Sequence, residues 1–427
     1  MKAFWSRIAR ELSPYVPGEQ PRIANLVKLN TNESPFGPSP LALEAMRAAA
    51  VDTLRLYPDP EAQELREALA VHHGIKPEQV FVGNGSDEVL AHAFVALLKQ
   101  PKPLLFPDVT YSFYPVWAQL FGLAFETVPL DDKMRVRVED YRREAGSIVI
   151  ANPNAPTGVA LPRAEIARLL EDHPDIPVVI DEAYVDFGGE SAVPLIADHP
   201  NLLVVQTMSK SRALAGLRVG YALGGVGLIE ALHRVKNSFN SYPLGRLAQA
   251  GATASVHDDA YFHESCARVV AGREAMTREL IRLGFVVLPS SANFVFARHP
   301  ARGGPEFAAA LREHAVLVRH FNKPRTAPYL RITVGTEDDV RRLIAAAAVL
   351  SSGMNSGWRE PRGQWARLRP KQPDGPVRGE AGRNQTPSCA AVPPPARGLT
   401  GQMLRVSVAD FHSARYWRRA PRRRLRG

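Results

Sequence analysis

The sequence predicts an α/β fold in which a mainly parallel sheet is flanked by helices and is followed by a smaller α/β unit. Along residues 1–352, short apolar runs alternate with amphipathic stretches of helical period. Three further strand-like runs follow between residues 285 and 334 and indicate a second sheet. Hydrophobic residues make up 45% and charged residues 22% of the chain, so a wholly disordered, collagenous or coiled-coil protein is excluded.

The expected elements follow from apolar periodicity and run length. Strands of the main sheet are expected at Val80–Val82, Pro103–Phe106, Ser147–Ala151, Pro177–Ile180, Leu202–Thr207 and Arg218–Leu223. Helices are expected at Pro60–His72, Asp87–Lys99, Arg163–Glu171, Leu228–Lys236, Asp258–Leu283, Gly304–His314 and Glu337–Ser351. The second sheet is expected to contain Phe285–Leu288, Asn293–Ala297 and Tyr329–Val334.

Charge and composition change at residue 353. The segment 353–427 contains 9 Pro and 9 Gly and has a net charge of +12, against −2 for residues 1–352. It has no sustained apolar face with which to offset its ordering entropy, so we expect a basic, disordered tail. The rest of the chain shows no global charge signal for nucleic acid, and we expect no specific nucleic-acid partner.

Targeting, membrane and metal signals are not evident in the sequence. Residues 1–13 contain four charged side chains and lack the apolar core of a signal peptide. The longest uncharged run, Val109–Phe125, includes Pro115 and polar side chains, which indicates buried structure and no membrane partner. Two cysteines, Cys266 and Cys389, cannot form a disulfide framework or a four-thiolate zinc site, so we expect no metal and a reducing, cytoplasmic compartment.

Three polar clusters follow expected strands, where ligands bind in open α/β sheets. Gly83–Glu88 could cradle a phosphate at a helix N-terminus, or it is a plain capped turn. Asp181–Tyr184 places a carboxylate beside a buried strand, where it needs a cation or donor unless it caps a loop. Lys210 could act as a Schiff-base nucleophile and Arg218 could hold a phosphate, although each alone could be a surface charge.

Together these clusters match the requirements of one cofactor. Pyridoxal phosphate needs a lysine for its aldehyde, a carboxylate for its pyridine nitrogen, donors for its phenolate oxygen and a phosphate cradle. The chain supplies a candidate for each, in the order cradle, carboxylate, lysine, arginine. No zincin helix, nucleophile elbow or P-loop competes. We therefore expect pyridoxal 5'-phosphate as the cofactor.

A set of motifs in one order identifies a family. They are Asn30–Pro38, Tyr57–Asp59, Gly83–Glu88, Asn152–Gly158, Asp181–Tyr184, Ser209-Lys210 with Arg218, and Leu330–Gly335. With them, residues 1–352 resemble the fold-type I pyridoxal-phosphate aminotransferases, most closely the histidinol-phosphate branch. The resemblance implies an N-terminal arm over 1–29, a large cofactor-binding domain over 30–245 and a small domain over 246–352. The tail 353–427 lies outside the resemblance.

The resemblance implies roles for the polar residues. Lys210 would bond the cofactor aldehyde and then move the proton between the substrate α-carbon and the cofactor. Asp181 would keep the pyridine nitrogen protonated, because a nearby negative charge raises the pKa of a cationic acid. Tyr184 would donate to the phenolate oxygen, and Tyr111 would stack on the pyridine ring.

The phosphate end of the cofactor and a second subunit are also implied by the resemblance. The expected phosphate-binding residues are Gly85, Ser86, Asp87, Thr207, Ser209 and Arg218. Tyr57 would reach the phosphate in a neighbouring subunit, so a homodimer with shared active sites is expected.

One position departs from the family pattern. Aminotransferases of this fold usually place an asparagine directly before Pro-Thr-Gly to bind the phenolate oxygen, and this chain has Ala155 there, preceded by Asn154. Either Asn154 reaches the cofactor, or Tyr184 makes that contact alone. Asn154 could also simply stabilise a turn.

The substrate residues complete the expectation. By resemblance, Arg331 would bind the substrate α-carboxylate, and Arg319 and Tyr15 would bind a distal phosphate. The implied reaction is transamination of L-histidinol phosphate with 2-oxoglutarate, which gives imidazole-acetol phosphate and L-glutamate in histidine biosynthesis. The alternatives are an aromatic amino-acid aminotransferase and a lyase or decarboxylase of the same fold. The non-enzyme alternative is a protein that binds nucleic acid through the arginines of its tail.

Overall fold

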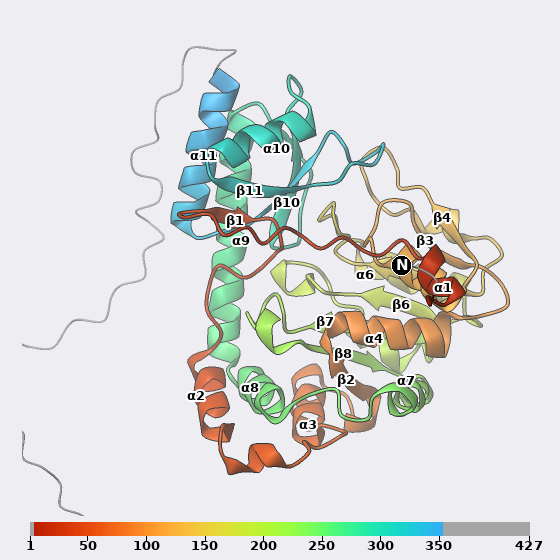
Figure 1. Ribbon diagram of the computed structural model, residues 1–427. Helices are drawn as coiled ribbons and strands as arrows, with labels where there is room; N and C mark the ends of the chain where they lie inside the picture. The colour runs from red at the N-terminus through yellow and green to blue at the C-terminus, as the bar shows by residue number, and fades with distance from the viewer. Residues whose placement is uncertain (1–3, 353–427) are drawn as a thin grey trace, which may run out of the picture. The chain divides into compact units, whose positions relative to one another are not determined.

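The computed structural model describes residues 4–352, and the expected disordered tail lies outside this range. Within it, the strands form a seven-stranded and a five-stranded sheet (Figure 1). The large sheet contains β2 (Val80–Asn84), β3 (Leu104–Pro107), β4 (Phe125–Val128), β5 (Ser147–Ala151), β6 (Val178–Asp181), β7 (Leu202–Thr207) and β8 (Val219–Gly224). The small sheet contains β1 (Val27–Leu29), β9 (Val286–Val287), β10 (Phe294–Arg298), β11 (Val316–His320) and β12 (Leu330–Thr333).

The large sheet is mainly parallel, which confirms the predicted fold class. Its strand order is β2-β8-β7-β6-β5-β3-β4. Strands β4, β3, β5, β6 and β7 pair in parallel, while β8 runs antiparallel to both of its neighbours, β2 and β7. The carboxyl ends of β2, β5, β6 and β7 therefore lie along one edge of the sheet, where ligands bind in such folds.

Helices cover both faces of the large sheet because its central strands are apolar on both sides. Along β7, Leu203 and Val205 belong to the core formed with α4 and α7, and Leu202 and Val204 belong to the core on the opposite face. The helices of the described chain are α1 (Arg7–Glu11), α2 (Pro40–Ala49), α3 (Gln63–His73), α4 (Gly85–Ala93), α5 (Tyr114–Phe121), α6 (Arg163–Asp172), α7 (Val226–Phe239), α8 (Arg246–His257), α9 (Asp259–Arg282), α10 (Gly304–Glu313) and α11 (Glu337–Ser352). Among residues 4–352, no helix has the length and apolarity of a membrane span.

The small sheet has its own core against α9, α10 and α11 (Figure 1). Its strand order is β1-β11-β12-β10-β9, and β1 pairs in parallel with β11. The edge strand β1 lies within the expected N-terminal arm, so the arm contributes directly to this sheet. The expected domain limits at residues 30, 246 and 353 remain predictions.

The sequence patterns missed several short elements. They are β1, β4, β11, α1, α2, α5 and α8. The face of α8 that packs on α2 consists largely of small residues. The two helices are close together there, since a Cβ added at Gly251 would lie only 2.7 Å from Met46 Cγ of α2. Such a close helix contact weakens the apolar periodicity on which a sequence-based prediction depends.

Strand β8 and the start of α4 approach so closely that a glycine is required between them. A Cβ added at Gly220 would collide with backbone atoms of Gly85 and Ser86. Gly85 itself has a φ of 81°, in the left-handed region that glycine adopts most easily. The contact holds the first turn of α4 against the sheet edge.

Gly220→Ala should therefore destabilise the protein. Backbone atoms must shift to accommodate the methyl group, which costs about 1–3 kcal/mol in the free energy of unfolding. Gly216→Ala is the matched control, because a Cβ there meets no heavy atom within 4 Å. Urea unfolding of both variants measures the difference, and equal stabilities would contradict the close approach.

Candidate active site

A pocket lies at the carboxyl edge of the large sheet and extends to the small sheet. It has about 800 Å³ of empty space, part of which is open to solvent. Twelve of the expected site residues line it: Tyr15, Ser86, Asp87, Tyr111, Asp181, Tyr184, Thr207, Ser209, Lys210, Arg218, Arg319 and Arg331. Among residues 4–352, no cluster of side chains suits a metal ion.

Asp181 is a buried carboxylate at the end of β6. Its side chain is 5% exposed and accepts hydrogen bonds from the Tyr114 hydroxyl at 2.9 Å and the Ala183 backbone N–H at 3.3 Å. Burial raises the pKa of Asp181 to about 6, because desolvation disfavours the charged form. A cation bound beside Asp181 would lower the pKa of this carboxyl group again.

Lys210 and Tyr184 lie on neighbouring walls of the pocket. Lys210 Nζ is 5.8 Å from the centre of the Tyr184 ring and 3.4 Å from the Thr31 carbonyl oxygen, to which it donates. The Tyr184 hydroxyl oxygen lies 2.9 Å from Asn32 Nδ2. Both walls thus contact the segment that follows β1.

Arg218, Asp87, Ser86 and Ser209 form an incomplete cradle. Arg218 Nη1 is 3.4 Å from Ser209 Oγ, and Arg218 Nη2 is 3.4 Å from Asp87 Oδ2. Charged hydrogen bonds are normally shorter, at about 2.7–2.9 Å, so these groups are not saturated by one another. The cradle borders the first turn of α4, whose N–H groups and dipole favour an anion.

Tyr111 contributes to the same end of the pocket. Its hydroxyl donates to Asp87 Oδ1 at 2.8 Å, which fixes both side chains. Burial, with Asp87 beside it, raises the pKa of Tyr111 well above its ordinary value, so the hydroxyl stays protonated.

Two arginines from the small sheet form the opposite wall. Arg319 of β11 and Arg331 of β12 are direct cross-strand neighbours. Arg331 Nη2 donates to the Asn30 carbonyl oxygen at 3.0 Å, but its buried Nε has no hydrogen-bond partner among the residues that the structure describes. Arg319 donates to the carbonyl oxygens of Val16 and Pro17, next to Tyr15. Like charges in this arrangement repel each other, so the wall suits an anion.

Three expected cofactor residues do not line this pocket. Gly85 lies beneath the cradle, where an added Cβ would collide with the Arg218 guanidinium. Asn154 donates through Nδ2 to the Val109 carbonyl oxygen and to Thr157 Oγ1, both at 3.0 Å, and it lines a separate cavity. Ala155 lines the pocket instead. In this geometry Asn154 does not reach the pocket, which favours the alternative that Tyr184 acts alone.

Tyr57, the third of these residues, lies on an exposed loop. Its side chain is 76% exposed and stacks on Tyr242. Arg246 Nη2 donates to the Tyr57 carbonyl oxygen at 2.6 Å, and Gln249 Nε2 donates to that of Asp59 at 2.8 Å. The loop is therefore held firmly by side chains from α8.

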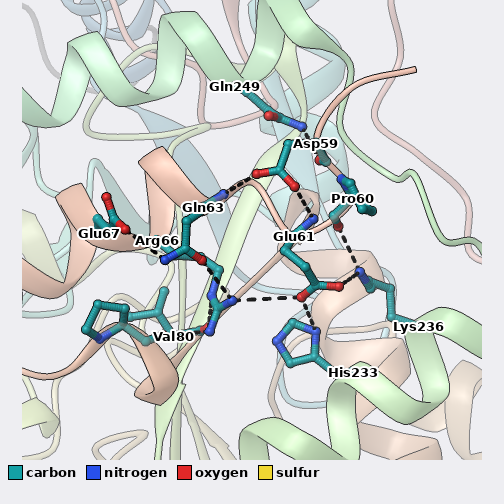
Figure 2. Close-up of polar contacts among 11 residues, drawn as sticks. Asp59, Pro60, Glu61, Gln63, Arg66, Glu67, Val80, His233, Lys236 and Gln249 are labelled. Carbon is teal, nitrogen blue, oxygen red and sulfur yellow. Dashed lines mark hydrogen bonds and ion pairs between the residues drawn. The ribbon is translucent and has the colours of Figure 1, made fainter. Parts of the chain in front are cut away.

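Figure 2 shows the rest of this support. Lys236 of α7, 1% exposed, donates to the Pro60 carbonyl oxygen at 2.8 Å and pairs with Glu61 Oε1 at 3.0 Å. The Asp59 carboxylate accepts from the backbone N–H groups of Glu61 and Gln63 (Figure 2). An exposed aromatic residue on a rigid loop suits a contact with another molecule.

Several pocket residues were not singled out as site residues in the sequence analysis. They are Gly18, Asn30, Thr31, Asn32, Ala151, Pro153, Ala155 and Ala183. Most belong to quoted motifs, such as Asn30–Pro38, but their side chains carry no charge or nucleophile that would mark them individually. Tertiary contacts show that the segment after β1 borders the pocket: β1 pairs with the small sheet, and Thr31 and Asn32 contact Lys210 and Tyr184.

The pocket as a whole fits pyridoxal phosphate. A buried carboxylate without a cation, a lysine, an unsaturated anion cradle and a tyrosine hydroxyl are the donor set that this cofactor needs. The cradle and Asp181 lie on the large-sheet side, whereas the arginine wall lies on the small-sheet side. This leaves room for an anionic substrate between them.

Comparisons with known proteins agree with this chemistry. The family model "Aminotransferase class I and II" matches residues 24–346. Histidinol-phosphate aminotransferase 2 of Rhizobium meliloti (strain 1021) is 62% identical over 346 residues, which cover 81% of this chain and 99% of that protein. Histidinol-phosphate aminotransferase 1 of Bradyrhizobium diazoefficiens is 63% identical over 344 residues, which cover 81% of this chain and 98% of that protein.

A solved structure also resembles the chain closely. The histidinol-phosphate aminotransferase from Sinorhizobium meliloti, in complex with pyridoxal-5'-phosphate, has a TM-score of 0.73 and 26% identity, and the match covers 82% of this chain and 98% of that one. The family match over 24–346 includes both sheets and all pocket residues except Tyr15 and Gly18. The chain belongs to the class I and II aminotransferases.

Proposed function

We propose that this protein is a pyridoxal-phosphate-dependent histidinol-phosphate aminotransferase, which transfers the amino group of L-histidinol phosphate to 2-oxoglutarate. The observation that supports it most is the single pocket that joins Lys210 and Asp181 to the Arg319–Arg331 wall. Relatives about 60% identical over nearly their whole length have this name. The products are imidazole-acetol phosphate and L-glutamate.

The residues divide the work between the two ends of the pocket. When bound, pyridoxal phosphate supplies an aldehyde that combines with amines and a ring that accepts the electron pair released at the substrate carbon. Asp181 holds a proton on the ring nitrogen through its negative charge. Lys210 Nζ anchors the cofactor and moves the proton at the substrate carbon that bears the amine. Arg218 and the first turn of α4 bind the phosphate.

The arginine wall selects the substrate. Arg319, with Tyr15, binds the distal phosphate of histidinol phosphate, and Arg331 binds the carboxylate of glutamate or 2-oxoglutarate. Both are charge-assisted contacts that a guanidinium can make in pairs. Because one wall serves both substrates in turn, the two half-reactions share a single binding site.

We further propose that the enzyme is a cytoplasmic homodimer in which Tyr57 of one subunit reaches the cofactor phosphate of the other. The exposed Tyr57 ring on a firmly held loop supports this assignment. The buried free thiol of Cys266 fits a reducing compartment.

A substrate comparison tests the proposed reaction. With 2-oxoglutarate as acceptor, kcat/KM should be higher for histidinol phosphate than for phenylalanine by about tenfold or more, because the Arg319 end of the wall binds a phosphate. Lys210→Ala is the blank and should lose turnover together with the visible absorption of the lysine-bound cofactor. A preference for phenylalanine would favour an aromatic aminotransferase, and carbon dioxide release would favour a decarboxylase.

The arginines should separate the two substrates. Arg331→Ala should lower kcat/KM for glutamate by about tenfold or more and that for histidinol phosphate by less, because the latter has no carboxylate. Arg319→Ala should instead lower kcat/KM for histidinol phosphate by about tenfold or more and that for glutamate by less. Steady-state kinetics with both amino donors measures the split. Equal losses in both variants would mean that the arginines act as one site for either anion.

Asp181 should make stability depend on pH. Burial raises the pKa of Asp181 from 3.8 to about 6, so the folded protein binds this proton more tightly than the unfolded chain does. Relative to Asp181→Asn, the cofactor-free wild type should lose stability as pH rises from about 4 to about 6, by up to about 3 kcal/mol. Urea unfolding across this range measures the difference, and added cofactor should abolish the loss. A pH-independent difference would contradict the assigned pKa.

Mixed dimers test the role of Tyr57. Tyr57→Phe should weaken cofactor binding about tenfold, the value of one hydrogen bond to a charged group. In a mixed dimer, one subunit carries Tyr57→Phe and the other carries Lys210→Ala. The site that keeps Lys210 then receives an intact Tyr57 from the partner subunit. Cofactor affinity at that site, measured by visible absorption, should therefore return to the wild-type value. Affinity that stays low would place Tyr57 at its own subunit's site.

A further inference from the structure

The hydroxyl of Tyr184 is in contact with one buried side chain, Asn32. Asn32 Nδ2 lies 2.9 Å from the Tyr184 hydroxyl oxygen. The Tyr184 ring packs edge-on against Phe294, with ring centres 5.1 Å apart, so the position of the hydroxyl is set from two sides. Both Asn32 and Tyr184 line the pocket that contains Lys210.

Asn32 is held in a single orientation. It is 1% exposed and has a φ of 56°, in the left-handed region that asparagine tolerates better than most residues. Its backbone N–H donates to Thr333 Oγ1, and its Oδ1 accepts from the same hydroxyl, each at 3.1 Å. Its carbonyl oxygen accepts from Asn293 Nδ2 at 3.0 Å. These contacts leave the carboxamide N–H facing Tyr184.

This orientation determines the direction of the tyrosine proton. An amide N–H can only donate, so the Tyr184 oxygen accepts from Asn32. The hydroxyl hydrogen of Tyr184 is then free to donate to another acceptor, and the open side of the hydroxyl is the pocket.

The neighbouring wall offers no second side-chain donor at the family's usual position. Ala155 lines the pocket there and has no polar side-chain atom. The amide of Asn154 is committed to Val109 and Thr157. The strength of the contact to the cofactor's ring oxygen therefore depends on how well Tyr184 is aimed.

We propose that Asn32 is a positioning residue that directs the Tyr184 hydroxyl proton toward the ring oxygen of the cofactor. The proposal rests on the cofactor site proposed above. Asn32 acts through Tyr184, and its effect is electronic as well as geometric, because an accepted hydrogen bond makes a hydroxyl a better donor.

The consequence can be measured by absorption. A donor at the ring oxygen withdraws negative charge, which lowers the proton affinity of the nearby nitrogen that joins the cofactor to Lys210. The pH midpoint of the visible absorption change reports this affinity. Among residues 4–352, the other charged or titratable groups that interact with Tyr184 are Lys210, Arg331 of β12, Tyr111 and Tyr114 of α5. Glu33, next to Asn32, interacts electrostatically with Lys210 and is held by Lys28 and Thr31. All remain unchanged in the variants.

Asn32→Gly is the first test, because glycine keeps the left-handed backbone and removes only the side chain. In the holoenzyme the absorption midpoint should rise by about one pH unit, the value of one weakened hydrogen bond. Tyr184→Phe should raise it at least as much. In the double variant the shifts should not add, since Asn32 acts only through the Tyr184 hydroxyl.

Thr333→Val is the second test and does not alter the pocket lining. It removes the hydroxyl that orients the Asn32 carboxamide, so the midpoint should rise in the same direction by a smaller amount. Thr326→Val is the matched control: Thr326 is also a buried threonine, but its hydroxyl donates to the carbonyl oxygens of Phe321 and Lys323, and it does not line the pocket. Its midpoint should equal that of the wild type, although its thermal stability falls.

The sign of the shift decides the proposal. A lower midpoint in Asn32→Gly would mean that Tyr184 normally donates to Asn32, and an unchanged midpoint would make Asn32 merely structural. Either result overturns the proposal, as would additive shifts in the double variant. If Asn32→Gly does not fold, Thr333→Val alone decides by the same criteria. A wild-type protein without visible absorption would instead overturn the proposed cofactor.

Discussion

The site is organised around a carboxylate that is buried without a cation. Asp181 ends the central strand β6, and from residues 4–352 its carboxylate receives two hydrogen bonds, from Tyr114 and from the Ala183 backbone. Within residues 4–352 it forms no ion pair, and desolvation disfavours its charged form. A cation bound beside Asp181, such as the ring nitrogen of the proposed cofactor, would therefore lower the cost of keeping this carboxylate charged. In the proposed function, cofactor affinity and the proton on the ring nitrogen would thus have the same physical origin.

The strand order brings the other groups to this carboxylate. Strand β7 lies beside β6, and its end leads within a few residues to Lys210 and then to Arg218 before β8 turns back. Arg218 has a left-handed φ of 56°, and the following β8 lies against the start of α4 at Gly220. The reversed strand β8 thus joins the lysine and the phosphate cradle through one loop. Packed backbone at Gly220 thus places this loop against the first turn of α4.

Sequence reasoning predicted the large-sheet half of the site because parallel strand ends converge wherever the helices lie between them. Asp181, Lys210 and Arg218 were expected near these strand ends, and the structure brings them to one pocket, while their roles stay proposals. It could not predict that Asn154 turns toward Val109 and Thr157, since that choice depends on competing hydrogen bonds at the turn. Asn32 escaped notice because its partner Tyr184 is 152 residues away. Strand β1 is three residues long, too short to show periodicity, so the tertiary contacts of the segment that follows it were not foreseeable.

The small sheet adds a second electrostatic constraint that complements the first. Arg319 and Arg331 face each other across β11 and β12, and the wall they form holds a buried Nε without a partner. Arg331 is also packed near the rings of Phe294 and Phe321, which stabilise a cation but do not neutralise it. Within residues 4–352, the pocket therefore has a carboxylate without a cation, Asp181, on one side and two guanidinium groups without a carboxylate, those of Arg319 and Arg331, on the other. The proposed cofactor, with its cationic ring nitrogen beside Asp181, and an anionic substrate at the arginine wall would satisfy both. Selection for phosphate or carboxylate at the arginine wall is then a matter of shape and reach, because the electrostatic preference for an anion is already present in the folded chain.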